Sequence, residues 1–229
     1  MTRIVDLTHP VSPETPVHPL DMRPKLAFIL SHDKDGMALS NMHLSAHTGT
    51  HMDAPYHMLA DGATLGEFPV SRFVGTGVVL DVRGRGPALT REDVELATAA
   101  AGGLQAGDFA LLWTGWDAHF EGPEQLRHPY LTAESAAFLR DAGVTLVGSD
   151  GSSMDSDMDF ADAQIGTGAG AEGMTFPAHL TLMGANVLIV ENLRGLGELV
   201  GRRVTCAFLP LRAMGTEGSP VRAIAWMES

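Results

Sequence analysis

The sequence predicts one compact α/β domain over residues 1–229, with a mixed β-sheet core and flanking helices. Short apolar runs bounded by turn residues alternate with two capped helical patterns, which is typical of an α/β fold. Several of these runs follow one another with no helix between them, which favours a mixed sheet. The 229 residues show no repeat period and no Ser/Gly-rich linker, and they suffice for one substantial core.

The first 82 residues contain three predicted strands and one irregular segment. Ile4–Leu7 is a short apolar run, and Lys25–Leu30 alternates loosely. Gly75–Val82 is apolar and bounded by turn residues, which indicates a buried strand. The segment Pro10–Pro24 is too rich in proline for a regular helix, because proline lacks the N–H that a helix interior needs.

Two segments have the start and stop signals of helices. The first begins after Thr90, a capping residue, has Glu92 and Asp93 in its first turn and stops at Gly102. The second covers Thr132–Gly143, where a threonine again forms the cap and a glycine ends the helix.

The rest of the chain supplies five more predicted strands and a long loop. The acidic, Gly-rich and non-periodic segment Asp155–Gly173 is expected to be a surface loop with a functional role. The apolar runs that predict strands, the last of them at a sheet edge, are Phe109–Trp113, Val144–Gly148, Val187–Glu191, Val204–Leu209 and Ala223–Trp226.

The composition excludes several functional classes. With 15 Lys+Arg against 28 Asp+Glu the net charge is −13, which disfavours nucleic acid as a partner. The single cysteine, Cys206, excludes an intrachain disulfide and a Cys-rich zinc module, and its apolar strand predicts an inert thiol. Because neither a secretory signal nor an apolar run long enough for a bilayer is visible, we expect a cytoplasmic protein with no membrane partner.

Three histidines and an aspartate cluster within eleven positions. These residues are His47, His51, Asp53 and His57. A lone histidine is more often a surface or satisfied core residue, but imidazole and carboxylate together are the ligands of zinc, manganese or iron at catalytic sites. The clustering therefore predicts a metal site.

The spacing of these residues requires a bend. Ligand atoms around one ion lie roughly 3–4 Å apart. On a straight strand His47 and His51 would be about 13 Å apart, and on a regular helix His51 and Asp53 would not share a face. Gly49 permits a turn and Pro55 fixes the exit, while His51 and Asp53 share one face of a short extended piece.

A second candidate pair lies downstream. His179 is expected in a helical turn that Gly184 ends, and Glu191 closes the apolar strand before it. A carboxylate at the end of a buried strand is costly unless it is paired or binds a metal. The alternative is a glutamate that reaches solvent, and these residues alone leave the two interpretations even.

Together these residues offer more ligands than one open catalytic zinc site, which needs three from the protein. Either two metals share bridging carboxylates, or some of the residues orient the ligands or act as bases. In both cases we expect a metal-bound hydroxide that attacks a carbonyl, with His57 moving the proton. The candidate ligands are His47, His51, Asp53, His179 and Glu191.

The stretch His47-Thr-Gly-Thr-His51-Met-Asp53-Ala-Pro-Tyr-His57 resembles the signature of the metal-dependent cyclase family, which includes bacterial kynurenine formamidase and isatin hydrolase. The eleven-residue motif is specific. The resemblance covers nearly the whole chain, because weaker pieces follow in the family's order at Val5–Thr8, Thr114–Asp117, His128–Leu131, Gly148–Asp150 and Ile189–Leu193.

This resemblance implies a two-metal site. His47, His51 and Asp53 would bind the first metal, and Asp53 would bridge to a second metal held by His179, with Glu191 touching both. The separation of the last two residues, 191 − 179 = 12, is the same as in the family. The implied cofactor is a divalent metal, two Zn²⁺ with Mn²⁺ as the alternative, and the implied assembly is a homodimer or homotetramer.

The resemblance also implies the reaction and the substrate, a small molecule. A metal-bound hydroxide would cleave the C–N bond of a small amide, formamide or cyclic imide/lactam, with His57 as general acid/base and arylformamidase, acting on N-formylkynurenine, as the leading activity. Kynurenine formamidases carry a tryptophan in the early Pro-rich loop that stacks on the substrate, and His18 stands at that place here. His18 is therefore the candidate substrate-binding residue.

Two alternatives remain beside arylformamidase. The first is an isatin hydrolase-like enzyme that opens a cyclic amide; the family's isatin hydrolases use one manganese and an amide at the late acidic position, so Glu191 favours the two-metal branch. The second is a non-catalytic metal-binding module. Structural zinc sites are closed and rich in cysteine, which disfavours this alternative.

The sequence also allows predictions for three histidines and a glycine-rich run outside the cluster. His43 shares parity with His47 and is a candidate to face the pocket, whereas His119 and His128 are expected to be exposed. The run Gly166–Gly170 lacks the pattern of a dinucleotide site.

Overall fold

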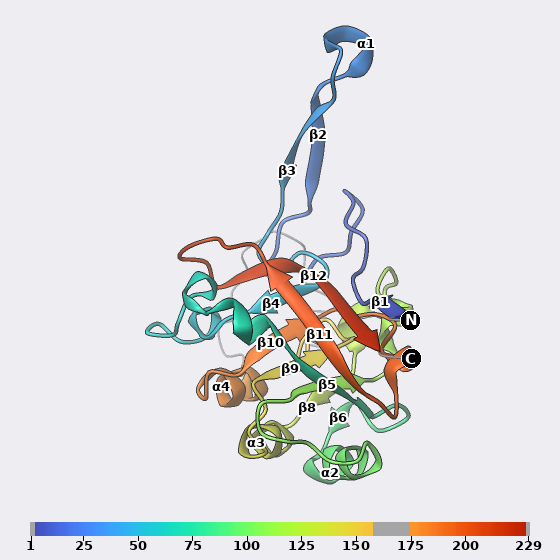
Figure 1. Ribbon diagram of the computed structural model, residues 1–229, viewed down its shortest axis with the longest axis vertical. Coiled ribbons are helices and arrows are strands. Elements are labelled where there is room, and N and C mark those ends of the chain that lie inside the picture. The colour runs from blue at the N-terminus through green and yellow to red at the C-terminus, as the bar shows by residue number, and fades with distance from the viewer. Residues whose placement is uncertain (1–2, 158–174, 228–229) are drawn as a thin grey trace.

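The structure, a computed structural model, describes residues 3–157 and 175–227. Its core is one mixed sheet (Figure 1) with strands in the order β1-β12-β11-β5-β7-β9-β10-β4. The bounds are β1 Arg3–Asp6, β4 His51–Asp53, β5 Val74–Asp81, β7 Phe109–Trp113, β9 Leu146–Ser149, β10 Leu188–Glu191, β11 Arg203–Pro210 and β12 Gly218–Met227.

This sheet closes on itself. The four central strands β5, β7, β9 and β10 run parallel to one another, and the other pairs are antiparallel, which confirms the predicted mixed sheet. In addition, residues 218–220 of β12 pair with β4, the last strand in the order. The closure was not predicted, because neither β4 nor the start of β12 is apolar enough to stand out as a strand.

Three helices cover the outer face of the sheet: α2 (Arg91–Ala100), α3 (Ala133–Asp141) and α4 (Pro177–Met183). Both predicted caps are present, since the Thr90 hydroxyl accepts the Asp93 N–H and the Thr132 hydroxyl accepts the Ser135 N–H, each at 3.3 Å. The buried apolar side chains of these helices belong to one hydrophobic cluster together with Leu80 of β5. A short parallel pair, β6 (Ala88–Leu89) and β8 (Tyr130–Leu131), precedes α2 and α3.

A second hydrophobic cluster fills the opposite face of the sheet. Val79 of β5 points into it, whereas its neighbours Val78 and Leu80 point to the helices, as alternation along a strand requires. Cys206 of β11 lies in the same cluster and is fully buried. Burial raises the pKa of its thiol to about 12, in agreement with the inert cysteine predicted from the sequence.

A two-stranded hairpin projects from the body of the molecule (Figure 1). It consists of β2 (Lys25–Leu30), the single turn α1 (His32–Asp35) and β3 (Leu39–His43). The first strand was predicted, but every residue of both strands except Leu30 is exposed. Its exposed apolar side chains are Leu26, Phe28, Ile29, Met37, Leu39 and Met42.

Two expectations about elements need correction. Residues 223–226 do not form an edge strand, because β12 lies between β1 and β11 and is ten residues long. The described start of the predicted Asp155–Gly173 loop is not at the surface, since Asp155 and Asp157 are 2% and 3% exposed. Most of that loop, and the Gly166–Gly170 run, lie outside the described residues.

In residues 3–157 and 175–227 no helix combines the length and the apolar character that a membrane crossing requires.

Candidate metal centre

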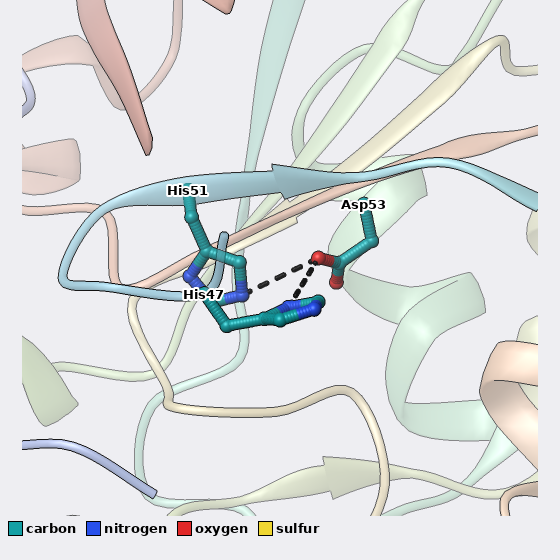
Figure 2. Close-up of side chains that lie close together, drawn as sticks. All are labelled: His47, His51 and Asp53. Carbon is teal, nitrogen blue, oxygen red and sulfur yellow. Dashed lines mark ion pairs between the residues drawn. The ribbon is translucent and has the colours of Figure 1, made fainter. Parts of the chain in front are cut away.

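The turn before β4 brings His47 beside that strand (Figure 2). Gly49 in this turn has a φ of 62°, in the left-handed region that favours glycine. His51 and Asp53 occupy alternate positions of β4, so their side chains leave the same face. As a result, His47 Nδ1 lies 2.8 Å and His51 Nε2 3.4 Å from Asp53 Oδ1, and the predicted bend is confirmed.

Strand pairing brings the downstream residues to the same point. Glu191 of β10 stands directly opposite His51 in the register, and its Oε2 lies 3.4 Å from His51 Nε2. His179 comes from α4, with Nε2 3.3 Å from Glu191 Oε1 and 3.9 Å from Asp53 Oδ2. Glu191 is 4% exposed, so this carboxylate does not reach solvent.

The five residues form two potential metal-binding groups that share Asp53. The groups are His47, His51 and Asp53, and Asp53, His179 and Glu191; within each group the ligand atoms lie within 4.8 Å of one another. Both oxygens of Asp53 are buried, and neither accepts a well-aligned hydrogen bond from the described residues, although His47 Nδ1 lies 2.8 Å from Oδ1. A buried carboxylate without well-aligned donors is costly unless a cation lies beside it, so these residues fit a divalent metal with nitrogen and oxygen ligands.

Further groups orient the candidate ligands. The Gly49 carbonyl lies 2.9 Å from His51 Nδ1, and Asp155 Oδ2 lies 2.7 Å from His179 Nδ1, so that both rings turn Nε2 to the centre. Glu217 Oε1 lies 3.4 Å from His47 Nε2. The sequence prediction missed Asp155 and Glu217, because both reach the centre through tertiary contacts and no local spacing marks them.

Opposite charges set the pKa values in this centre. Burial opposes ionisation of Asp53, but the charges of His51 and His47 hold its pKa far below the usual range. Burial is likewise outweighed at Glu191, where hydrogen bonds from His179 and His51 lower the pKa to about 2. Burial disfavours the charged form of His179, yet Asp155 and Glu191 raise its pKa. The carboxylates are therefore ionised at neutral pH, and the imidazoles must release protons to bind a cation.

A cavity of about 360 Å³ opens onto this centre, a volume at the lower end for small-molecule sites. The His57 ring lies in its wall, 4.4 Å from the centre of the His47 ring and 6.0 Å from that of His179. Burial lowers the pKa of His57 despite the nearby charge of Asp53, so the ring is neutral at pH 7 and able to take up a proton. His18 lines the same cavity.

Two of the other histidines differ from expectation. His43 is exposed on β3 of the hairpin and does not line the cavity. His119 is exposed as expected, but His128 is 1% exposed, because its Nε2 pairs with Asp157 Oδ2 at 3.1 Å. The polar sequence around His128 gave no sign of this buried partner.

A family model described as "Putative cyclase" matches residues 5–156, well over half of the chain. The chain belongs to this family. The matched stretch includes the motif from His47 to His57, whereas His179 and Glu191 lie beyond it. The family predicted from the sequence is therefore confirmed.

Relatives of this cyclase-family chain extend over its whole length. It is 30% identical over 225 residues to the kynurenine formamidase of Salinibacter ruber, with 96% of each chain covered. Among solved structures, isatin hydrolase A from Labrenzia aggregata is 28% identical with a TM-score of 0.85, covering 100% of this chain and 94% of that one. A potential metal-dependent hydrolase with cyclase activity is 27% identical with a TM-score of 0.76, covering 100% of both.

These similarities also confirm two further predictions, the α/β fold with a mixed sheet and the enzyme class, a hydrolase. The fold places the cluster of histidines and acids along β4 and at the carboxyl end of β10, beside the cavity.

Proposed function

We propose that this chain is a metal-dependent hydrolase that cleaves the C–N bond of a small amide, formamide or cyclic imide/lactam. The observation that carries the proposal is Asp53, a buried carboxylate that is shared by two groups of potential ligands beside one cavity. Residues 1–229 would form a single hydrolase domain.

The candidate cofactor is a pair of Zn²⁺ ions, with Mn²⁺ as the alternative. His47, His51 and Asp53 would hold one ion, and Asp53, His179 and Glu191 the other. A bound divalent cation lowers the pKa of a water molecule and polarises a carbonyl oxygen.

The protein's own side chains supply orientation and proton transfer. Asp155 and the Gly49 carbonyl fix the rings of His179 and His51, which keeps their Nε2 atoms directed to the centre. His57, neutral at pH 7, lies on the cavity wall beside these rings and would take up the proton that the attacking water releases and pass it to the leaving nitrogen.

Arylformamidase activity on N-formylkynurenine is the leading candidate, because a relative of the same length carries the name kynurenine formamidase. Hydrolysis of a cyclic amide is the second candidate. It is favoured by the isatin hydrolase neighbours and by His18, whose imidazole lines the cavity where a formamidase would present an indole. An imidazole offers a smaller ring for stacking than an indole does.

Metal analysis combined with hydrolysis assays tests the proposal. The purified chain should contain divalent metal and should hydrolyse at least one of N-formylkynurenine, isatin and succinimide. Dialysis against a chelator should abolish turnover reversibly while the circular dichroism spectrum is kept. Global unfolding on metal removal, with no turnover of any of the three compounds, would instead indicate the non-catalytic metal-binding module.

The homodimer or homotetramer expected from the sequence is also a proposal, and we assign its interface to the hairpin of β2 and β3. An isolated two-stranded hairpin is marginally stable in water, and this one exposes large apolar side chains. The two lysines and two aspartates of residues 25–43 cancel, on a chain with a net charge of −13. The hairpin is therefore a part of the surface that a second copy can approach without repulsion.

A cytoplasmic location stays a prediction from the sequence.

A further inference from the structure

A further buried carboxylate lies in the cavity wall and belongs to neither group of potential metal ligands. Asp157 lines the cavity and is 3% exposed. Its Oδ2 accepts hydrogen bonds from His128 Nε2 at 3.1 Å and from the Ser152 hydroxyl at 3.0 Å. The proposed mechanism assigns no role to Asp157 or to its partner His128, although removing two charged side chains from water is costly.

The hydrogen bonds of His128 determine its charge. Its Nδ1 lies 3.0 Å from the Pro129 carbonyl, which can only accept, so Nδ1 carries a proton. Its Nε2 faces the Asp157 carboxylate, so both ring nitrogens act as donors. Although burial opposes the charge, the hydrogen bond that His128 donates to Asp157 raises the pKa of His128. The pair is thus an imidazolium and a carboxylate, and it holds Oδ2 of Asp157 in place.

The other oxygen of Asp157 has capacity for a further donor. Oδ1 lies 3.8 Å from His18 Nε2, which is beyond hydrogen-bond distance. Asp21 lines the same cavity, and its buried Oδ2 accepts no hydrogen bond from the described residues. The apolar part of the cavity wall is formed by Pro16, Val17, Leu20, Met58 and Phe176, and the neutral polar side chains in the wall are Gln125, Ser152, Ser153 and Asn192.

We infer that Asp157, together with Asp21, determines substrate specificity by accepting hydrogen bonds from an amino group that the substrate carries away from its scissile amide. The substrate class is then a small, mostly apolar amide with a primary amine or ammonium group. This inference rests on the proposed function. A charge-assisted hydrogen bond in a buried site favours such a substrate over its alkyl isostere by about tenfold or more, because without the amine the acceptor is desolvated and unpaired.

A matched pair of probes tests this inference on the metal-loaded enzyme. The probes are 3-(aminomethyl)formanilide and its isostere 3-ethylformanilide, compared by kcat/KM. Their anilines, 3-(aminomethyl)aniline and 3-ethylaniline, are compared by Kd, which gives a readout that does not depend on turnover. We expect about tenfold preference for the amine in both measurements.

Two substitutions should remove this preference. In D157N the amide oxygen must accept from His128 and Ser152, so the amide nitrogen faces the cavity as a donor and repels an amine. In D21N the charge is lost at a less buried position, which keeps the test valid if D157N folds poorly. The readout is the ratio between the two probes in each variant, so a change in turnover that both probes share does not affect the result. E92Q, at an exposed position of α2 outside the cavity, is the charge-matched control and should keep the preference.

The outcomes separate this inference from the proposed function. Equal Kd values for the two anilines in the unsubstituted enzyme would overturn it, whether or not the formanilides are hydrolysed. A preference that survives in both D157N and D21N would overturn it as well. No hydrolysis of either formanilide, N-formylkynurenine, isatin or succinimide, with an aniline preference that both substitutions abolish, would support the amine subsite and contradict the proposed function.

Discussion

Glu191 lies directly opposite His51 across the pairing of β10 with β4, and their side chains approach to 3.4 Å. The register of two strands far apart in sequence therefore sets the geometry between the early histidine motif and the late acid. A site on paired strands is more rigid than a site on loops. Because Asp53 belongs to the same strand as His51, one register positions the carboxylates of both potential ligand groups.

Glu191→Gln should reduce the metal content from two ions per chain to one. The amide keeps the volume of the side chain but loses the negative charge that the group of Asp53, His179 and Glu191 offers a cation. Inductively coupled plasma mass spectrometry of the purified variants measures this number, and E92Q serves as a surface control. If the unsubstituted chain already holds a single ion, the two-metal proposal is wrong.

Asp155→Asn should weaken metal binding about 10- to 100-fold at the group that contains His179. The Asp155 carboxylate accepts from His179 Nδ1 and from the backbone N–H groups of Ala178 and His179, so it fixes both the ring and the first turn of α4. Competition with a fluorescent chelator measures the affinity. Partial recovery in Asp155→Glu would indicate that the carboxylate orients the ring, whereas an unchanged affinity in Asp155→Asn would argue against this role.

The parts of the fold that could be predicted from the sequence are those encoded locally. Thr90 and Thr132 cap helices through contacts three residues away, and Gly49 with its positive φ marks the bend of the metal motif. The shared face of His51 and Asp53 follows from strand geometry alone.

The parts that could not be predicted depend on tertiary contacts. The closure of the sheet comes from the pairing of β12 with β4, which are far apart along the chain. Asp155, Glu217 and Asp157 act only after folding brings them to His179, His47 and His128. The motif resemblance supplied His179 and Glu191, whose local sequence left their role undecided.

His57→Ala should lower kcat about 10²- to 10⁴-fold while the metal content stays the same. The ring lies on the cavity wall beside the candidate ligands, and burial lowers its pKa so that it is neutral at pH 7 and ready to exchange a proton. Steady-state kinetics on the preferred amide, with metal analysis of the same sample, measures both quantities. Loss of metal together with rate would show that His57 acts as a ligand instead.

Replacing Phe28 and Met42 together by serine should dissociate the homo-oligomer. Both side chains lie on the projecting hairpin and are 78% and 69% exposed, so the change removes apolar area from the proposed interface without opening a cavity in the core. Size-exclusion chromatography with light scattering gives the mass at each concentration. Leu96→Ser, on the exposed face of α2, is the matched control and should leave the mass unchanged. An unsubstituted chain that is monomeric at micromolar concentration would contradict the proposed interface.

The free energy of unfolding should decrease as the pH falls from about 6.5 toward 4, because of the buried side chain of His9. Burial, with the nearby charge of Arg194, lowers the pKa of His9 to about 4. In this interval the unfolded chain binds a proton on His9 that the folded chain does not, so the free energy of unfolding decreases with falling pH.

His9→Phe tests this contribution, because a phenyl ring can keep the stacking on Phe120, whose ring centre lies 3.8 Å from that of His9, and does not titrate. The unfolding temperature of this variant should therefore fall by several degrees less between pH 7 and pH 5 than that of the unsubstituted chain. His119→Gln changes an exposed imidazole on the neighbouring 3-10 helix and should keep the original pH dependence. Identical pH dependence in all three proteins would show that groups other than His9 account for the acid sensitivity. A His9 that is buried as a neutral ring requires the unsubstituted chain and His9→Phe to differ in this dependence.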